Sequence, residues 1–217
     1  MAESAGYNCV ATVTGTSTAF TAQAMTGSGA GPYQIASAKQ VWDPEGTFTF
    51  YDNGVAISSG DILTVDYLLG KVTFTGSKTG PITADGDYLP RLSWVKARSV
   101  SVSKVADKLD TSVFGSQYKT SIQGMVEISG TAEVIEPLST DLDSGGDSRT
   151  WDAVFDGGTQ VVLEVLPDGS KGLRFWAVLF GTATNVNTAE LVGYEFSFAS
   201  VVVTADDGTR ITPAVVA

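Results

Sequence analysis

The chain has 217 residues, 24 acidic and 13 basic side chains, no histidine and a formal net charge of -11. This negative charge repels a phosphate backbone, so we do not expect the protein to bind nucleic acid through Lys and Arg. The absence of histidine removes the usual general base and the commonest transition-metal ligand, so an enzyme would have to rely on carboxylates. Hydrophobic residues make up 43% of the chain, enough for a folded core.

No run of about 18 apolar residues is present, and the N-terminus has no basic segment followed by an apolar one. We therefore expect no membrane association, and assembly in a cytoplasm. Cys9 is the only cysteine, so no intrachain disulfide can form, and we assign it no role. No cofactor is expected.

Residues 1–32 are predicted to form an extended N-terminal arm and loop, because small and β-branched residues alternate and glycines follow them. Residues 33–90 are predicted to form an accessory region of short hairpins. The first hairpin turns at Asn53-Gly54, a pair typical of a type I′ turn. The second spans 63–74, with Gly70 in a bulged connection. Trp42, in a Val-Trp-Asp-Pro turn, is predicted to be exposed as a partner contact.

Residues 91–217 are predicted to form the main β core, with long strands over 92–105, 122–135 and 191–204. Between the second and third, shorter strands are expected at 160–166 and 173–180. The one helix, at about 148–156, has a capping residue at Asp147 or Ser148 and an apolar stripe that includes Trp151.

Alternation places small and acidic side chains on one face of the long strands. In the strand 122–135 the apolar face holds Val126, Ile128, Ala132 and Val134. The opposite face and its expected neighbours comprise Glu127, Ser129, Thr131, Glu133, Ser99, Ser101 and Ser103. Strands this long need partners along their whole edge.

No catalytic or metal-binding site is assigned. Glu127 and Glu133 are six residues apart on one strand, about 20 Å, too far for the two carboxylates of a glycosidase. The loop 141–147 resembles the start of a calcium loop, but Gly145 replaces a ligand and Asp152 stands where a bidentate glutamate is needed. We interpret this loop as a turn that caps the helix.

The order of these segments resembles the major tail (tail tube) proteins of long-tailed phages. The resemblance rests on three stretches: Val41-Trp42-Asp43-Pro44 through the hairpin at 65–74, then Asp110 to Gly115 leading to 118–124, and the Trp151 helix with the strand after it. It implies an all-β sandwich or barrel subunit with one flanking helix. It also implies hexameric rings, stacked into a tube with other phage tail proteins, and a location in the virion.

The resemblance further implies that long hairpins from each copy join into one wall around a lumen through which DNA passes without specific binding. On this basis the lumen-facing candidates are Glu127, Ser129, Thr131, Glu133, Ser99, Ser101 and Ser103. Lys96, Arg98 and Trp42 are the candidate contacts between subunits.

Three alternatives stay open. Another virion protein, for tail completion or capsid decoration, would form a closed ring or trimer and no filament. A carbohydrate-binding β-sandwich would account for the aromatic residues and the loop at 141–147. A glycosidase that uses only carboxylates is the third, although the carboxylate spacing disfavours it.

Overall fold

The computed structural model describes residues 10–93, 97–110, 121–134, 156–166, 171–185 and 193–216, and its regular structure is nearly all strand. The predicted all-β class is confirmed. The predicted helix at about 148–156 lies outside the described residues apart from Asp156. Within the described ranges, no helix has the length and hydrophobicity needed for a membrane span.

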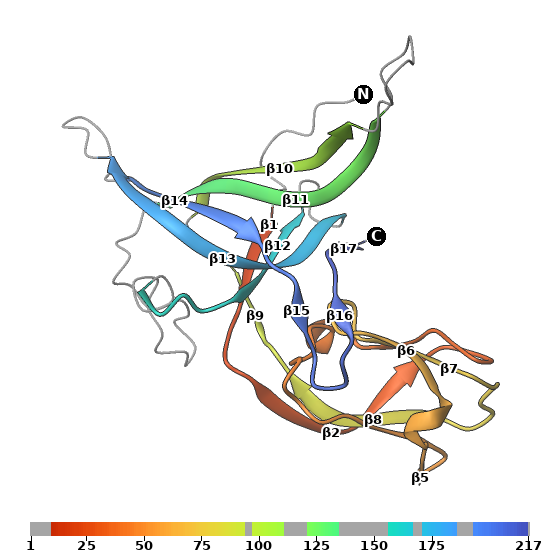
Figure 1. Cartoon of the computed structure of the whole chain (residues 1–217). Helices are drawn as coiled ribbons and strands as arrows, with labels where there is room; N and C mark the ends of the chain where they lie inside the picture. Colours follow the sequence, from red (N-terminus) through yellow and green to blue (C-terminus); the bar gives the residue numbers. More distant parts are fainter. Residues whose placement is uncertain are drawn as a thin grey trace, which may run out of the picture.

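The first sheet has eight strands in the order β10-β11-β14-β13-β12-β1-β9, with β17 also paired to β13. All of its pairings are antiparallel. It curls, so that β1 and β12 run across the direction of β10 and β11 (Figure 1). The bounds are β1 Val10–Thr14, β9 Arg91–Ser93, β10 Ala97–Asp110, β11 Ser121–Val134, β12 Val161–Leu166, β13 Gly172–Asn185, β14 Gly193–Ser200 and β17 Ala214–Val216.

One face of the first sheet is buried over β11 to β14. Its rings Phe175 and Phe198 lie 6.0 Å apart between centroids. Along each strand, the buried side chains alternate with side chains that point the other way. The other buried members of this face come from β11, β12 and β13 and are Ile128, Ala132, Val161, Leu163, Ala177 and Leu179. This burial follows from the period of two along a strand.

The second sheet has seven strands in the order β5-β4-β8-β2-β3-β7-β6. Two single-turn helices, η2 Ser37–Lys39 and η3 Ser59–Asp61, connect its strands, and a separate hairpin of β15 Val203–Thr204 and β16 Arg210–Ile211 lies beside it. The strand bounds are β2 Thr18–Thr26, β3 Tyr33–Ile35, β4 Thr49–Asp52, β5 Val55–Ala56, β6 Ile62–Asp66, β7 Lys71–Phe74 and β8 Ile82–Tyr88.

The two predicted hairpins of the second sheet are confirmed. β4 pairs with β5 across Asn53 and Gly54, whose φ angles of 51° and 81° are the positive values that a type I′ turn needs. β6 pairs with β7, with a register shift between Ile62 and Thr64 and with Gly70 at a φ of 59°. The turn chemistry therefore fixed both hairpins locally.

The second sheet is an insertion between two paired strands of the first. β1 and β9 are antiparallel neighbours, and the amide of Gly15 donates to the carbonyl of Pro90 at 2.8 Å. The chain therefore leaves the first sheet after Gly15, forms the second sheet, and re-enters the first sheet after Pro90. Residues 10–14 and 18–26, where the sequence predicts an arm, are β1 and β2 and so supply one strand to each sheet.

The predicted exposure of Trp42 is wrong. Its side chain is 0% exposed, stacked on Phe48 with ring centroids 4.9 Å apart, and an isolated bridge joins its backbone to Tyr88. Phe50 and Tyr67 complete the aromatic cluster around it. Trp42 is therefore at the centre of the second sheet's core and is unavailable as a contact between subunits.

A charged group joins the two sheets at a seam formed by Arg91, Glu164 and Arg174. Glu164 on β12 and Arg174 on β13 are 2% and 0% exposed and form an ion pair. Arg174 also donates to the carbonyl of Leu68 in the second sheet. Arg91 donates to Glu164 at 3.0 Å and to the carbonyl of Ser37 at 2.7 Å. Both arginines thus connect one buried carboxylate to the second sheet.

A strap, residues 201–213, crosses the seam between the end of β14 and the start of β17. The amide of Val201 donates to the carbonyl of Trp176, and the amide of Asp206 donates to that of Pro44. The Tyr67 hydroxyl donates to the Asp207 carboxylate at 3.0 Å. The strap therefore ties the first sheet to the second (Figure 1).

Replacing Tyr67 with phenylalanine should weaken this strap by about 1 kcal/mol, because one hydrogen bond to a carboxylate at the surface is lost. Burial, and then the hydrogen bond to Asp207, raises the pKa of the Tyr67 hydroxyl. Since the unfolded chain releases this proton near pH 10, the stability that Tyr67 contributes is complete below that pH and declines above it.

Chemical unfolding of both proteins between pH 7 and about pH 11 measures this difference. The gap in unfolding free energy between the parent and Tyr67→Phe should narrow as the pH rises. If the difference in unfolding free energy stays constant with pH, the pKa of the Tyr67 hydroxyl is not raised in the folded protein.

Candidate functional site

Four neighbouring strands of the first sheet, β10-β11-β14-β13, carry mostly small polar and acidic side chains on one face, and we call them the four-strand section. Cross-strand register sets rows of side chains on one face. One row contains Ser103, Ser129, Ala199 and Val178, and the next contains Ser101, Thr131, Ser197 and Phe180. A third row contains Ser99, Glu133 and Glu195. These rows form one surface, which we call the polar face.

The polar face brings together all seven residues that the sequence predicts for a lumen. Ser99, Ser101 and Ser103 on β10 lie opposite Glu133, Thr131 and Ser129 on β11. Glu127 continues the β11 row, opposite Val105. Their common face is thus established by the register, whereas their position in a lumen stays a prediction.

Hydrogen bonds between side chains hold this surface together. The Ser101 and Thr131 hydroxyls are 2.9 Å apart, and the Ser99 hydroxyl donates to the Glu133 carboxylate at 3.4 Å. Small hydroxyls that bond across the strands leave a smooth surface. These hydroxyl and carboxylate side chains cannot form ion pairs with a polyanion.

Glu195 is a further acidic member of the polar face. It lies directly opposite Glu133 across β11 and β14. Alternation in the predicted strand 191–204 already places Glu195 on a small, acidic face, but it does not identify the partner strand. With Glu127, three carboxylates are placed on the polar face by register, and no Lys or Arg is among its described side chains.

Both outer edges of the four-strand section are unpaired among the described residues. β10, 14 residues long, pairs only with β11. At the other side, β12 pairs with β13 only as far as Ala177, so residues 178–185 have β14 on one edge and no described strand on the other. Unpaired N–H and C=O groups along such edges are ready to pair with another strand.

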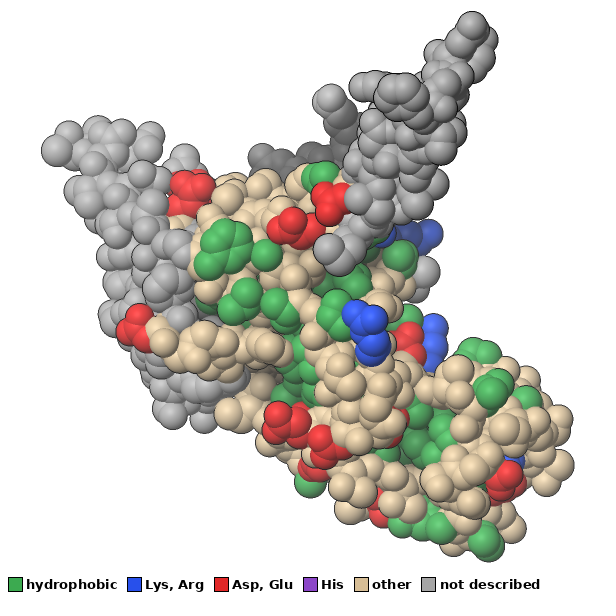
Figure 2. All heavy atoms as spheres, in the orientation of Figure 1, with side chains coloured by type: hydrophobic (Ala, Val, Ile, Leu, Met, Phe, Trp, Pro, Cys, Tyr) green, Lys and Arg blue, Asp and Glu red, His purple; other side chains and the backbone are tan. Residues whose placement is uncertain are grey.

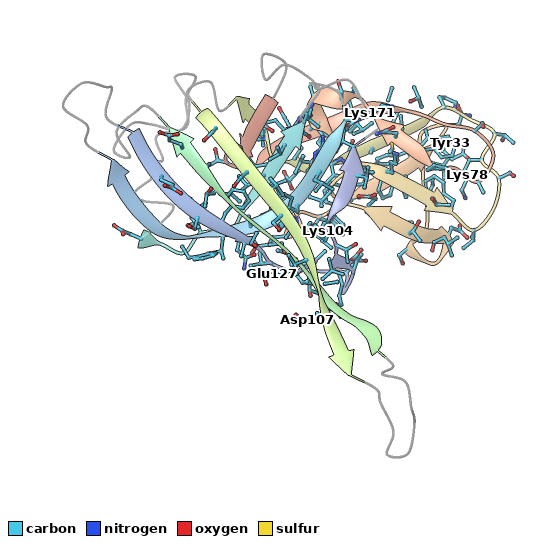
Figure 3. The ribbon with its side chains drawn as sticks, turned by 90° about the horizontal axis from the view of Figure 1, so that it is seen from above. Tyr33, Lys78, Lys104, Asp107, Glu127 and Lys171 are labelled. Atoms are coloured by element: carbon cyan, nitrogen blue, oxygen red, sulfur yellow. The ribbon has the colours of Figure 1, made fainter. Side chains whose placement is uncertain are left out.

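The hairpin of β10 and β11 projects beyond its neighbours. β14 pairs with β11 only from Ser129 onward, so the part of the hairpin beyond that point is a two-stranded ribbon. Figure 3 shows this ribbon extending past the other strands, with Lys104, Glu127 and Asp107 along it. In the view of Figure 2, hydrophobic side chains reach the described surface in separate patches rather than as one broad area.

Gly130 lies where β10, β11 and β14 pack most closely. A Cβ at this position would be 2.0 Å from the Ser101 carbonyl oxygen and 2.6 Å from the Phe198 ring. Since the nearest atom belongs to the backbone, Gly130→Ala should lower the unfolding free energy by about 3 kcal/mol. Gly76→Ala is the matched control, because no atom lies within 4 Å of the added Cβ.

Urea unfolding of the two glycine variants measures the effect. If Gly130→Ala is as stable as Gly76→Ala, the close approach of the three strands is incorrect.

Of the remaining predicted residues, Trp42 is buried in the core of the second sheet. Lys96 and the loop 141–147 lie outside the described residues, as does the side chain of Arg98. Among the side chains that are described, no group of three or more Cys, Asp or Glu residues is arranged to hold a metal ion.

No family model matches the chain, and no curated protein matches it. The solved structures that resemble part of it include two gene transfer agent particles. One is the tail of an empty gene transfer agent particle, with C6 symmetry, at 13% identity and a TM-score of 0.39 over 52% of this chain and 82% of that chain. The other is the virion of a native gene transfer agent particle, at 16% identity and a TM-score of 0.43 over 59% and 89%. Both similarities are weak, and we infer a function from the strand edges and the polar face.

Proposed function

We propose that this chain is a structural virion protein whose copies join edge to edge into rings, and that the rings stack into a phage tail tube that conducts DNA. The observation that carries this proposal is the pair of unpaired edges on one four-strand section, β10 on one side and the end of β13 on the other. Within a single copy, no described strand covers either edge, and a ring of identical copies would cover both.

Strand direction is compatible with ring closure. The three pairings within the section are antiparallel, so β10 and β13 also run in opposite directions. When β10 of one copy meets β13 of the next, the alternation continues without a parallel pair. The joined sections then form a closed barrel, in which no edge is left.

The polar face is the lumen surface in this proposal. Glu127, Glu133 and Glu195 give it negative charge, while the Ser101 and Thr131 hydroxyls bond to each other and Ser99 donates to Glu133. DNA moving through such a tube meets no salt bridge that would retain it. The second sheet is attached at the seam with β12 and β13, away from the β10 edge.

Electron microscopy of the purified protein, with sedimentation at increasing concentration, tests assembly. Stacked rings with a central channel are expected, and a species that stays monomeric at every concentration would contradict the proposal. Closed rings or trimers that never stack would instead favour a tail-completion or capsid-decoration protein. A monomer that binds glycans would favour the carbohydrate-binding alternative.

Two proline variants on β10 test the edge directly. Successive residues of an edge strand direct their N–H groups alternately toward the paired neighbour and outward. Val102→Pro and Ser103→Pro therefore remove one N–H of each kind. The variant that loses the outward N–H should unfold like the parent yet fail to assemble, because the incoming strand meets a proline.

The other proline variant should be destabilised, since it loses a bond to β11. Unfolding curves and sedimentation separate the two effects. If a proline variant of parental stability assembles as the parent does, β10 is not the assembling edge.

A further inference from the structure

Among the described side chains of the polar face, two large hydrophobic ones are exposed. Val105 on β10 is 56% exposed and Phe180 on β13 is 48% exposed. The register places both on the polar face, Val105 opposite Glu127 and Phe180 opposite Ser197. A valine and a phenylalanine on a surface of serines, threonines and carboxylates need a structural explanation.

These two side chains lie at opposite sides of the surface: Val105 is in the two-stranded ribbon, just beyond the four-strand section, and Phe180 is at the β13 edge of that section. Val105 belongs to β10, whose outer edge is unpaired among the described residues, and Phe180 belongs to the unpaired part of β13. Within one copy, β11 and β14 separate them, so they cannot cover each other. Each is therefore next to the position that a strand of another copy would take.

We propose that Val105 of one copy packs against Phe180 of the next as a cross-strand pair, and that this pair sets the register of the joint between copies. The inference rests on the proposed edge-to-edge assembly and adds the register to it. β10 and β13 run antiparallel, so directly opposite residues of the two copies share a face. An aromatic and a β-branched side chain are a favourable pair in that position.

The offset that this pairing needs is the one expected for a barrel whose shear equals its strand number. Within a copy, the row of Phe180 reaches β10 at Ser101, and Val105 lies four residues farther along. A barrel whose shear equals its strand number has strands tilted by about 36°, so the register advances by about four residues over every four strands. The row that contains Phe180 then continues into Val105 of the next copy.

Other registers leave the two side chains exposed. An offset of zero would place Phe180 against Ser101 of the next copy, and an odd offset would turn the polar face of one copy toward the other side of the sheet. Only with Val105 opposite Phe180 do the two exposed hydrophobic side chains of this surface cover each other. The pair thus selects one register among several that backbone hydrogen bonds alone would allow.

Engineered disulfides in assembled tubes test the register. Cys9→Ser removes the only native thiol, and Val105→Cys with Phe180→Cys is then introduced into the same chain. Mild oxidation of the tubes, followed by a non-reducing gel, should give a ladder from dimers to whole rings. The matched control is Ser101→Cys with Phe180→Cys, and its cross-linked fraction should be at least about fivefold lower, because its Cβ atoms lie beyond disulfide reach.

The outcomes separate this inference from the proposed function. Tubes in which the Ser101 pair cross-links and the Val105 pair does not would overturn the register and keep the tube. Tubes in which neither pair cross-links would overturn the contact in the same way. Protein that folds but forms no rings would overturn the proposed function and this inference with it.

A charge pair gives a second measurement that does not depend on thiols. Val105→Glu and Phe180→Lys should each reduce assembly as single variants, and the double variant should recover it. Recovery at low salt that is lost at high salt is expected for a direct contact. A double variant that assembles no better than the single variants would overturn the contact.

Discussion

Replacing Glu164 with alanine is expected to destabilise the subunit by about 3–5 kcal/mol, because it leaves a buried arginine without its counter-charge. Arg174 is 0% exposed, and Glu164 is its ion-pair partner and hydrogen-bond acceptor. Burial lowers the pKa of the Arg174 guanidinium, while Glu164 opposes that shift. A water molecule cannot replace the carboxylate at such a buried position without rearrangement.

Urea unfolding of the free subunit measures this loss. Glu164→Gln is the informative companion, since an amide oxygen still accepts a hydrogen bond but carries no charge, and an intermediate loss is expected. Glu45→Ala serves as the surface control, because Glu45 is exposed. A change below about 1 kcal/mol for Glu164→Ala would show that the seam is not maintained by this carboxylate.

Reversing the charge of the polar face is expected to make the proposed tube bind and retain DNA. Lysines at Glu127, Glu133 and Glu195 add cations that repeat around every ring of the proposed tube. Since each phosphate contact releases a counterion, affinity for a duplex should rise by about 100-fold or more at low salt and fall steeply as salt increases.

Binding of a short DNA duplex to assembled tubes, with and without nuclease, measures the effect. DNA inside the tube is protected, and DNA on the outside is digested. The matched control reverses three exposed carboxylates elsewhere, Glu45, Asp61 and Asp206. The polar face does not line the channel if the DNA bound by both triple variants is digested by nuclease. The same conclusion follows if neither variant binds DNA.

Local signals in the sequence predicted much of the fold. The Asn53-Gly54 turn and the hairpin around Gly70 depend on residues a few positions apart, and both are present as expected. The period of two predicted β11 to within one residue at each end, and the common face of its serine and glutamates with the serines of β10. The strand predicted at 92–105 is displaced, because the structure has β9 at 91–93 and β10 at 97–110. Each of these features is determined within a short stretch of chain.

Features that depend on distant contacts could not be predicted. Trp42 is in a polar turn, but residues 6 to 46 positions away, among them Phe48, Tyr67 and Tyr88, bury it. Residues 10–14 and 18–26 have small, weakly apolar side chains and become strands because β9, β12 and β8 supply their partners. Propensity alone cannot reveal such partners.

The candidate site divides in the same way. Alternation placed Glu127, Ser129, Thr131 and Glu133 on one face, but the unpaired end of β13 is visible only once β12 is seen to stop at Val161, opposite Ala177. Arg174 lies in the strand predicted at 173–180, but its carboxylate partner on β12 could not be identified from that stretch. Edges and buried ion pairs are properties of the assembled sheet.

Gly15 and Pro90 are joined by a hydrogen bond, and β1 and β9 pair beside them. The residues between these two positions could therefore be replaced as one unit in an engineered protein. A short turn could reconnect the two strands, provided that Val162 and Trp176, which lose their cover, are made polar. In the proposed tube, a foreign domain spliced at the same two points would then be displayed at regular intervals along the particle, with the channel wall left as it is.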